Sequence, residues 1–292
     1  MDWQDRLIDV YCRVCDAFDK EDLMYIPRIS NNSFPRFTDQ EVLTIFYTGI
    51  IEGITEIKKI HKKARQYWGS WFPFLPGYKQ FLKRVNALAD VMQEHVTTLS
   101  YLGIFEGNIG FVLDSMPIIL SNNFSTKNSR KLDCIANVGY CASKKKHYYG
   151  MKLHMIAERS LEGLPKPQMA FLTAASEHDL SCLKYFSEDI WECEIYCDKA
   201  YCDQNFQNEI AYEQGTLIST PIKKPKGREF LAFERIYNEF ISRIRQPIEA
   251  VFADLIKKTN LQNGSLIRSV KGLHAHVYGR IAAFMLLKQQ NA

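Results

Sequence analysis

The spacing of apolar residues changes near Gly107, and this change constrains the fold of the 292-residue chain more than any other feature. Before it, apolar residues such as Leu7 and Val10 recur every three or four positions, which is the period of an amphipathic helix. Thr38-Asp-Gln-Glu41 has the pattern of a capping box, which marks the start of a helix. Residues 1–105 are therefore predicted to form an all-helical domain.

Further helices are predicted within this amino-terminal domain. The basic segment Lys58–Arg65 fits one, Pro73 and Pro76 break the chain, and the apolar period from Tyr78 to Leu99 predicts one long helix. Several short helices with a basic member resemble a helix-turn-helix module. We expect this domain to bind DNA.

After Gly107 the chain contains short apolar runs with the composition of β-strands, with helical patterns between the later ones. The runs are Ile109–Asp114, Met116–Leu120, Tyr148–Ala157, Gln168–Ala174, Glu194–Asp198 and Thr216–Ile222. The polar stretch Ser121–His147 is interpreted as a long connection that binds a polyanion. A helical stripe from Phe233 to Leu255, interrupted at Pro247, and a last helix complete an α/β domain predicted over residues 106–292.

Basic residues occur in clusters, although 37 basic against 33 acidic residues make the chain only mildly basic. Clusters of this kind suit a phosphate backbone, and each can equally be a solvated face. The candidate DNA contacts in the clusters are Lys58, Lys59, Lys62, Lys63, Arg65, Arg130, Lys131, Lys144, Lys145, Lys146, Lys223 and Lys224. Four aromatic residues directly after the first cluster either stack on bases or belong to the core; these are Tyr67, Trp68, Trp71 and Phe72.

Three acidic residues stand in unusual settings. Asp114 closes one apolar run, Asp198 closes another, and Glu249 lies in the long helical pattern. A carboxylate at the end of an apolar strand is costly to bury unless a cation meets it. Two aspartates and a glutamate can hold a pair of Mg²⁺ ions, which take oxygen ligands and serve phosphodiester chemistry.

Each acid also has a structural interpretation. Asp114 and Asp198 can each be a structural cap, and Glu249 can pair with Arg245 one turn earlier. From the residues alone, Glu239, Glu249 and Asp254 are almost equally good candidates for the third acid.

Two other classes of protein are disfavoured. The eight cysteines lack the paired spacing of a structural zinc site, so reduced thiols are expected. No apolar stretch reaches the length of a membrane span, and the acidic start does not resemble a signal peptide. We expect a cytoplasmic protein with no membrane partner.

Five motifs, in order and spacing, resemble the DDE transposases of bacterial insertion sequences, whose catalytic core is similar to ribonuclease H. The motifs are Val112–Pro117, Tyr149–His154, Glu177–Asp179, Ile195–Tyr201 and Arg245-x3-Glu249. In the related group with a tyrosine, arginine, glutamate and lysine signature, Ser242 stands here for the tyrosine and Ile256 for the lysine. The arginine is kept.

The resemblance implies a ribonuclease H-like five-stranded mixed sheet flanked by helices, preceded by the helical domain. It places Asp114 on the first strand, Asp198 just past the fourth and Glu249 on a later helix, converging to bind two Mg²⁺ ions, with Mn²⁺ as a substitute. Four more DNA contacts are expected near this site: Lys152, Lys199, Tyr201 and Arg245.

The resemblance also implies the reaction. The chain is expected to bind the terminal inverted repeats of its insertion sequence, cleave by metal-dependent hydrolysis and join the 3′-hydroxyl ends to target DNA. Because two ends are cut together, a homodimer on DNA is expected. The alternatives are a metal-dependent DNA nuclease and a non-catalytic DNA-binding regulator.

Overall fold

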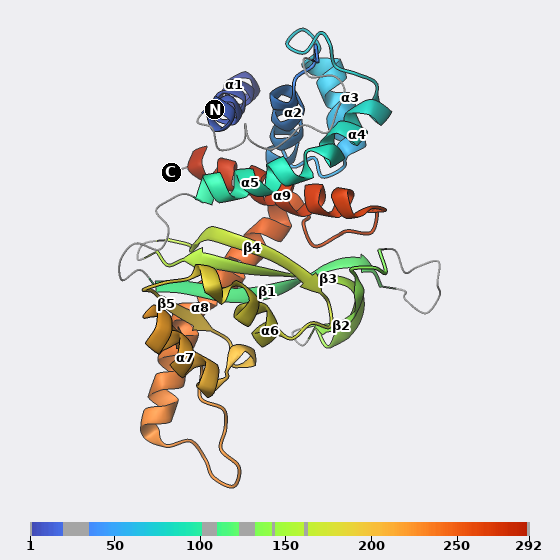
Figure 1. Ribbon diagram of the computed structural model, residues 1–292. Coiled ribbons are helices and arrows are strands. Elements are labelled where there is room, and N and C mark those ends of the chain that lie inside the picture. The colour runs from blue at the N-terminus through green and yellow to red at the C-terminus, as the bar shows by residue number, and fades with distance from the viewer. Residues whose placement is uncertain are drawn as a thin grey trace. The chain divides into compact units, whose positions relative to one another are not determined.

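The computed structural model describes residues 2–19, 35–100, 110–122, 132–141, 144–160 and 163–290. Contacts divide the chain into two compact units, Met1–Ser100 with Leu255–Ala292 and Tyr101–Asp254 (Figure 1). Packing thus groups Leu255–Ala292 with the amino-terminal helices. The predicted division into a DNA-binding domain of residues 1–105 and a catalytic domain of residues 106–292 concerns function, and it stays a prediction.

The regular elements described in the first unit are helices, which confirms the expected helical leader. Its helices are α1 (Trp3–Asp19), α2 (Asp39–Ile51), α3 (Ile57–Tyr67), α4 (Tyr78–Ala87), α5 (Ala89–Ser100) and α9 (Val270–Gln290). The predicted capping box is present, since the Thr38 hydroxyl accepts from the Glu41 amide and the Glu41 carboxylate accepts from the Thr38 amide. Val42–Ile50 are all buried, so α2 forms the centre of this unit.

The prediction of one long helix from Tyr78 to Leu99 was wrong. The helix divides into α4 and α5 at Leu88, whose amide donates to the carbonyls of both Arg84 and Val85. The added bond to Val85 spans three residues, as in a 3₁₀ turn, and the α-helical conformation is interrupted at Leu88. The apolar period continues across the break because Val85 and Met92 are both buried, and so the sequence does not show it.

His95 gives the helical unit a predictable acid sensitivity. It is 0% exposed, its Nδ1 lies 3.2 Å from the Tyr47 hydroxyl, and burial lowers its pKa to about 4. Between pH 6.5 and pH 4 the unfolded chain therefore binds this proton and the folded chain does not, so stability falls as the pH falls through this window. When the pH falls from 7 to 5, the free energy of unfolding of the wild type should drop. In His95→Leu this drop should be smaller by about 2 kcal/mol. Urea unfolding at both pH values measures this, and an equal loss in both proteins would contradict it.

The second unit contains a six-stranded mixed sheet, which confirms the α/β class. Its strands are β1 (Gly110–Ser121), β2 (Asn137–Cys141), β3 (Lys146–Glu158), β4 (Lys166–Ala174), β5 (Glu194–Cys197) and β6 (Leu217–Ser219). The order is β2-β3-β1-β5-β6, with β4 also paired to β3. β1 runs antiparallel to β3 and parallel to β5, and β5 runs parallel to β6.

Two strand predictions need correction. The sheet has six strands and not five, because β2 lies within the stretch interpreted as a loop. Gly139 in its centre conceals it in the sequence, although a side chain there would collide with Ala175. The runs ending at Asp114 and starting at Met116 are one continuous strand, so Asp114 lies in mid-strand and not at its end.

Helices cover both faces of this sheet (Figure 1). α6 (Asp179–Phe186) and α7 (Gln204–Gln214) pack on the face that carries Phe111 and Leu113. α8 (Ala232–Thr259) approaches the other face, where Phe240 contacts the Tyr196 ring. Among the helices in the described part of the chain, none is long and apolar enough to cross a bilayer.

α8 continues through Pro247, so the predicted interruption was wrong. Proline lacks the amide hydrogen that would bond to the carbonyl of Arg243. The next turn is nevertheless held by the core, since Ile248 is 0% and Val251 is 1% exposed.

Candidate active site

Asp114 and Asp198 are brought together by the register of two parallel strands. β1 pairs with β5 so that Leu113 is the partner of Cys197. The next residue of each strand is an aspartate, and neighbouring strands lie about 4.8 Å apart. Two acids separated by 84 positions (198 − 114 = 84) thus become neighbours at the point where β5 ends.

Arg245 on α8 lies between the two carboxylates. Its Nη1 is 3.0 Å from Asp114 Oδ2, and its Nη2 is 3.7 Å from Asp198 Oδ1. Burial raises the pKa of Asp114, while the Arg245 guanidinium opposes this rise. The Asp114 side chain is 20% exposed and that of Asp198 is 40% exposed, so the pair opens toward solvent on the Asp198 side. The structure therefore collects two negative charges around one cation.

Both aspartates are also fixed by backbone amides. Asp114 accepts from the amide of Ser115 at 2.8 Å, and Asp198 accepts from the amide of Lys199 at 2.7 Å. Asp198 thereby caps the single turn Lys199–Tyr201, in agreement with the structural interpretation of this residue. The longer helix α7 has its own cap in Asp203.

Glu249 is exposed on α8, one turn after Arg245, and the interactions described for Arg245 are with the two aspartates. Within the described residues, no group of three or more His, Cys, Asp or Glu side chains is placed to hold a metal ion. The structure thus gathers two of the three expected ligands. Their chemistry fits a divalent cation, because two carboxylates supply hard oxygen atoms where a positive charge already lies.

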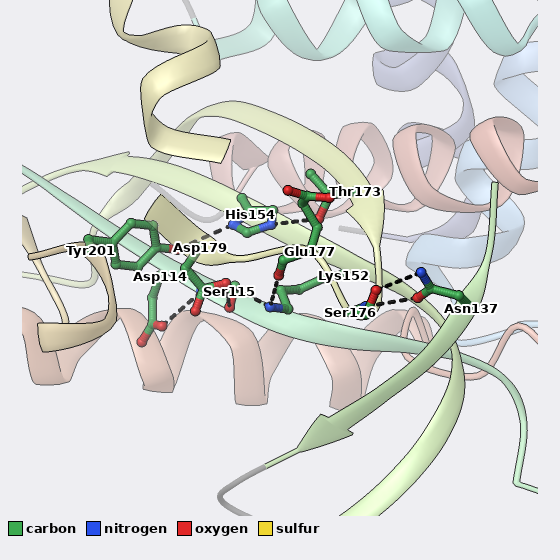
Figure 2. Close-up of polar contacts among 10 residues, drawn as sticks. All are labelled: Asp114, Ser115, Asn137, Lys152, His154, Thr173, Ser176, Glu177, Asp179 and Tyr201. Atoms are coloured by element: carbon green, nitrogen blue, oxygen red, sulfur yellow. Dashed lines mark hydrogen bonds and ion pairs between the residues drawn. The ribbon is translucent and has the colours of Figure 1, made fainter. Parts of the chain in front are cut away.

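A second polar cluster lies around Lys152, Asp179 and Ser115 (Figure 2). Lys152 on β3 donates to Asp179 and to the carbonyl of Glu177, each at 2.8 Å, and the Ser115 hydroxyl lies 3.5 Å from Asp179. Adjacent strand residues point to opposite faces, so Ser115 and Asp114 serve different sides of the sheet. The Lys152 amine is thus already engaged within the protein.

His154 and Tyr201 extend this polar cluster into the core. The ring nitrogens of His154 lie 3.2 Å from the Tyr201 hydroxyl and 2.9 Å from Thr173 Oγ1 (Figure 2). His154 is 0% exposed and Tyr201 is 1% exposed. Tyr201 was expected to contact DNA, but its burial leaves it no surface for such a contact.

The pair formed by Lys152 and Asp179 gives a stability prediction. Their side chains are only 17% and 19% exposed, so Lys152→Met leaves a poorly solvated carboxylate without its partner. We expect the free energy of unfolding to fall by about 3 kcal/mol, and we expect the double variant Lys152→Met/Asp179→Leu to recover part of this loss. Urea unfolding of the three proteins measures both effects. A single variant as stable as the wild type would show that the pair contributes nothing.

The remaining basic candidates are mostly at the surface. Exposed side chains include Lys58, Lys59, Lys62, Arg65, Lys144, Lys145, Lys146, Lys199, Lys223 and Lys224. Several have acidic partners: Lys59 pairs with Glu56, Lys63 with Glu52, and Lys224 with Glu229. Arg130 and Lys131 lie outside the described residues.

The four aromatic residues after the first basic cluster divide evenly between the two interpretations. Trp68 is 0% and Phe72 is 5% exposed, so both belong to the core. Tyr67 is 59% and Trp71 is 43% exposed. Two rings therefore remain accessible to a partner.

Sequence reasoning missed how Arg245 is used. It lies 131 positions from Asp114, and the expected local partner was Glu249. No local signal predicts this ion pair, because it depends on how α8 docks against β1 and β5.

A mixed sheet that places two acids side by side on parallel strands, around a cation, defines a candidate site for metal-assisted chemistry. The description "Transposase DDE domain" belongs to the family whose profile matches residues 106–269, more than half of the chain. The chain belongs to this family of DDE transposases. A search of curated proteins gives no match.

Proposed function

We propose that this transposase binds the terminal inverted repeats of its insertion sequence, cleaves them by metal-dependent hydrolysis and joins the freed 3′-hydroxyl ends to target DNA. The observation that carries the proposal is the register that sets Asp114 beside Asp198, with Arg245 between them. The sheet order without β2, which is β4-β3-β1-β5-β6, supports a ribonuclease H-like core.

Asp114, Asp198 and Glu249 are the proposed ligands of two Mg²⁺ ions, with Mn²⁺ as a substitute. Bound divalent ions would stabilise the charge on the attacking and leaving oxygens of the phosphodiester. Helix phase supports Glu249 as the third ligand. At 3.6 residues per turn, Glu249 lies about 40° around α8 from Arg245, whereas Glu239 lies about 120° and Asp254 about 180° away.

The residues of the chain divide the remaining tasks. Asp114 belongs to a strand that is paired on both sides, so the sheet restricts the position of its carboxylate. Asp198 is more exposed and is oriented by the Lys199 amide. The exposed Lys199 and the Arg245 guanidinium are proposed to hold phosphates of the DNA strand at this site.

The basic surfaces on α3, at Lys144–Lys146 and at Lys223 with Lys224 are proposed DNA contacts. If they are, affinity falls steeply with salt because bound phosphates release counterions. We expect the logarithm of the binding constant to fall with the logarithm of salt concentration at a slope of about −5 or steeper, as for five or more contacts. Fluorescence anisotropy at salt concentrations from about 50 to about 300 mM measures this slope. A flat response would contradict these surfaces.

The test of function uses a labelled oligonucleotide that carries the terminal repeat, a target plasmid, and Mg²⁺ or Mn²⁺. Cleavage followed by joining supports transposition. Cleavage without joining or end preference would identify a nuclease, and binding alone a regulator. Because two ends are cut together, we also propose a homodimer on DNA, within the cytoplasm.

A further inference from the structure

A cavity in the helical unit combines aromatic rings with lysines. It has a volume of about 560 Å³ and is lined by Trp3, Lys59, Lys62, Lys63, Gln66 and Tyr67, together with Trp68. Trp3 is the first residue of α1 and the others belong to α3 or follow it directly. The size falls within the range of pockets for small molecules.

The aromatic residues of the pocket leave flat surface available. Trp3 is 37% and Tyr67 is 59% exposed. Trp68 forms part of the floor, and its buried indole N–H has no hydrogen-bond acceptor in the described part of the protein. The pocket thus offers partly exposed aromatic surface from Trp3 and Tyr67.

The lysines give the pocket a positive charge. α3 carries five basic residues and no acid, and Glu52 and Glu56 beside it pair with Lys63 and Lys59. No acidic partner within the described residues holds Lys62, which is exposed. An anionic ligand is therefore favoured.

We propose that this pocket holds an unstacked base of DNA between Trp3 and Tyr67, while Lys59 and Lys62 bind the phosphates beside it. Rings stack on any base, and lysines bind phosphate without regard to sequence, which together fit a single-stranded or locally opened segment. An acidic peptide would use the lysines but would leave the two ring faces without a flat partner. This site rests on the proposed DNA binding and lies outside the unit that carries the acidic pair.

The test measures the affinity of the full chain for a labelled single-stranded oligothymidylate. Trp3→Ala and Tyr67→Ala should each weaken binding by about 5- to 150-fold, the range for loss of one stacked base. Trp71→Ala is the matched control, since Trp71 is 43% exposed but does not line the pocket. Lys79→Ala serves the same purpose for Lys62→Ala, since Lys79 is exposed on α4 and does not line the pocket.

Inorganic polyphosphate, which carries charge but no bases, separates stacking from electrostatics. Lys62→Ala should weaken binding of both polymers, whereas Trp3→Ala and Tyr67→Ala should weaken only the oligothymidylate. Equal effects of Trp3→Ala and Trp71→Ala, or unchanged oligothymidylate affinity in both ring variants, would overturn the base pocket. Matching melting temperatures exclude unfolding as the cause.

The same proteins show which proposal fails. If the wild type neither cleaves nor joins DNA, while Trp3→Ala and Tyr67→Ala still weaken oligothymidylate binding, the transposase reaction is overturned and the base pocket is supported. If the wild type cleaves and joins DNA, but Trp3→Ala and Tyr67→Ala bind oligothymidylate like the wild type, the base pocket is overturned and the transposase reaction is supported.

Discussion

Asp114→Asn is expected to lower the rate of strand cleavage by roughly 10³-fold or more, because metal-assisted charge stabilisation contributes several kcal/mol to the transition state. Asparagine keeps the shape of the side chain but removes the charge that a divalent cation requires. Asp198→Asn should have an effect of similar size, since the two carboxylates face the same guanidinium. Both variants should bind the terminal repeat as the wild type does. Single-turnover cleavage and anisotropy measure the two properties separately.

The third acid can be tested with a matched pair on one helix. Glu249 and Glu239 are both exposed on α8, and they differ in their angle to Arg245. Glu249→Gln should reduce cleavage as strongly as Asp114→Asn, while Glu239→Gln should leave it unchanged. The opposite result would transfer the role to Glu239. Full cleavage activity in Asp114→Asn and Glu249→Gln alike would show that these acids do not form the catalytic site.

The second large effect concerns Arg245. Arg245→Leu leaves two adjacent carboxylates without their cation, and the Asp114 side chain is only 20% exposed. Without divalent metal we expect the free energy of unfolding to fall by about 2 to 3 kcal/mol and the melting temperature by roughly 5 to 10 °C. Millimolar Mg²⁺ should then raise the melting temperature of the variant more than that of the wild type, since the metal no longer competes with an arginine.

Arg243→Leu is the control for this experiment. Arg243 lies on the same helix, its side chain is 76% exposed, and it pairs with Glu239 at the surface. Such a pair contributes less than about 1 kcal/mol, so this variant should melt like the wild type with or without metal. If Arg245→Leu behaved in the same way as Arg243→Leu, the guanidinium would have no part in holding the two aspartates.

Local signals predicted local structure well. The capping box at Thr38 and Glu41 is complete within four residues, and the structure contains it. β2 escaped prediction because Gly139 is explained only by Ala175, which belongs to a distant segment. Leu88 looks like any other apolar residue in a helical period, and only the structure shows that the helix is interrupted there.

The candidate site depends even more on distant contacts. The sequence identified Asp114 and Asp198 as candidate ligands, but their proximity results from the register between β1 and β5. The ion pairs of Arg245 depend on the docking of a helix against two strands. Tyr201 looked like a surface residue beside Asp198, because the sequence does not show the side chains that cover it.

The position of Asp114 in mid-strand has a consequence for damaged copies of the gene. Side chains alternate between faces, so one extra codon between Gly110 and Asp114 would turn the carboxylate toward α6 and α7. Two extra codons would restore the face but displace the residue along the strand by about 7 Å. Small in-frame insertions here can therefore inactivate the protein while the sheet still forms. Folding of the protein from a given gene copy does not show that the copy can transpose.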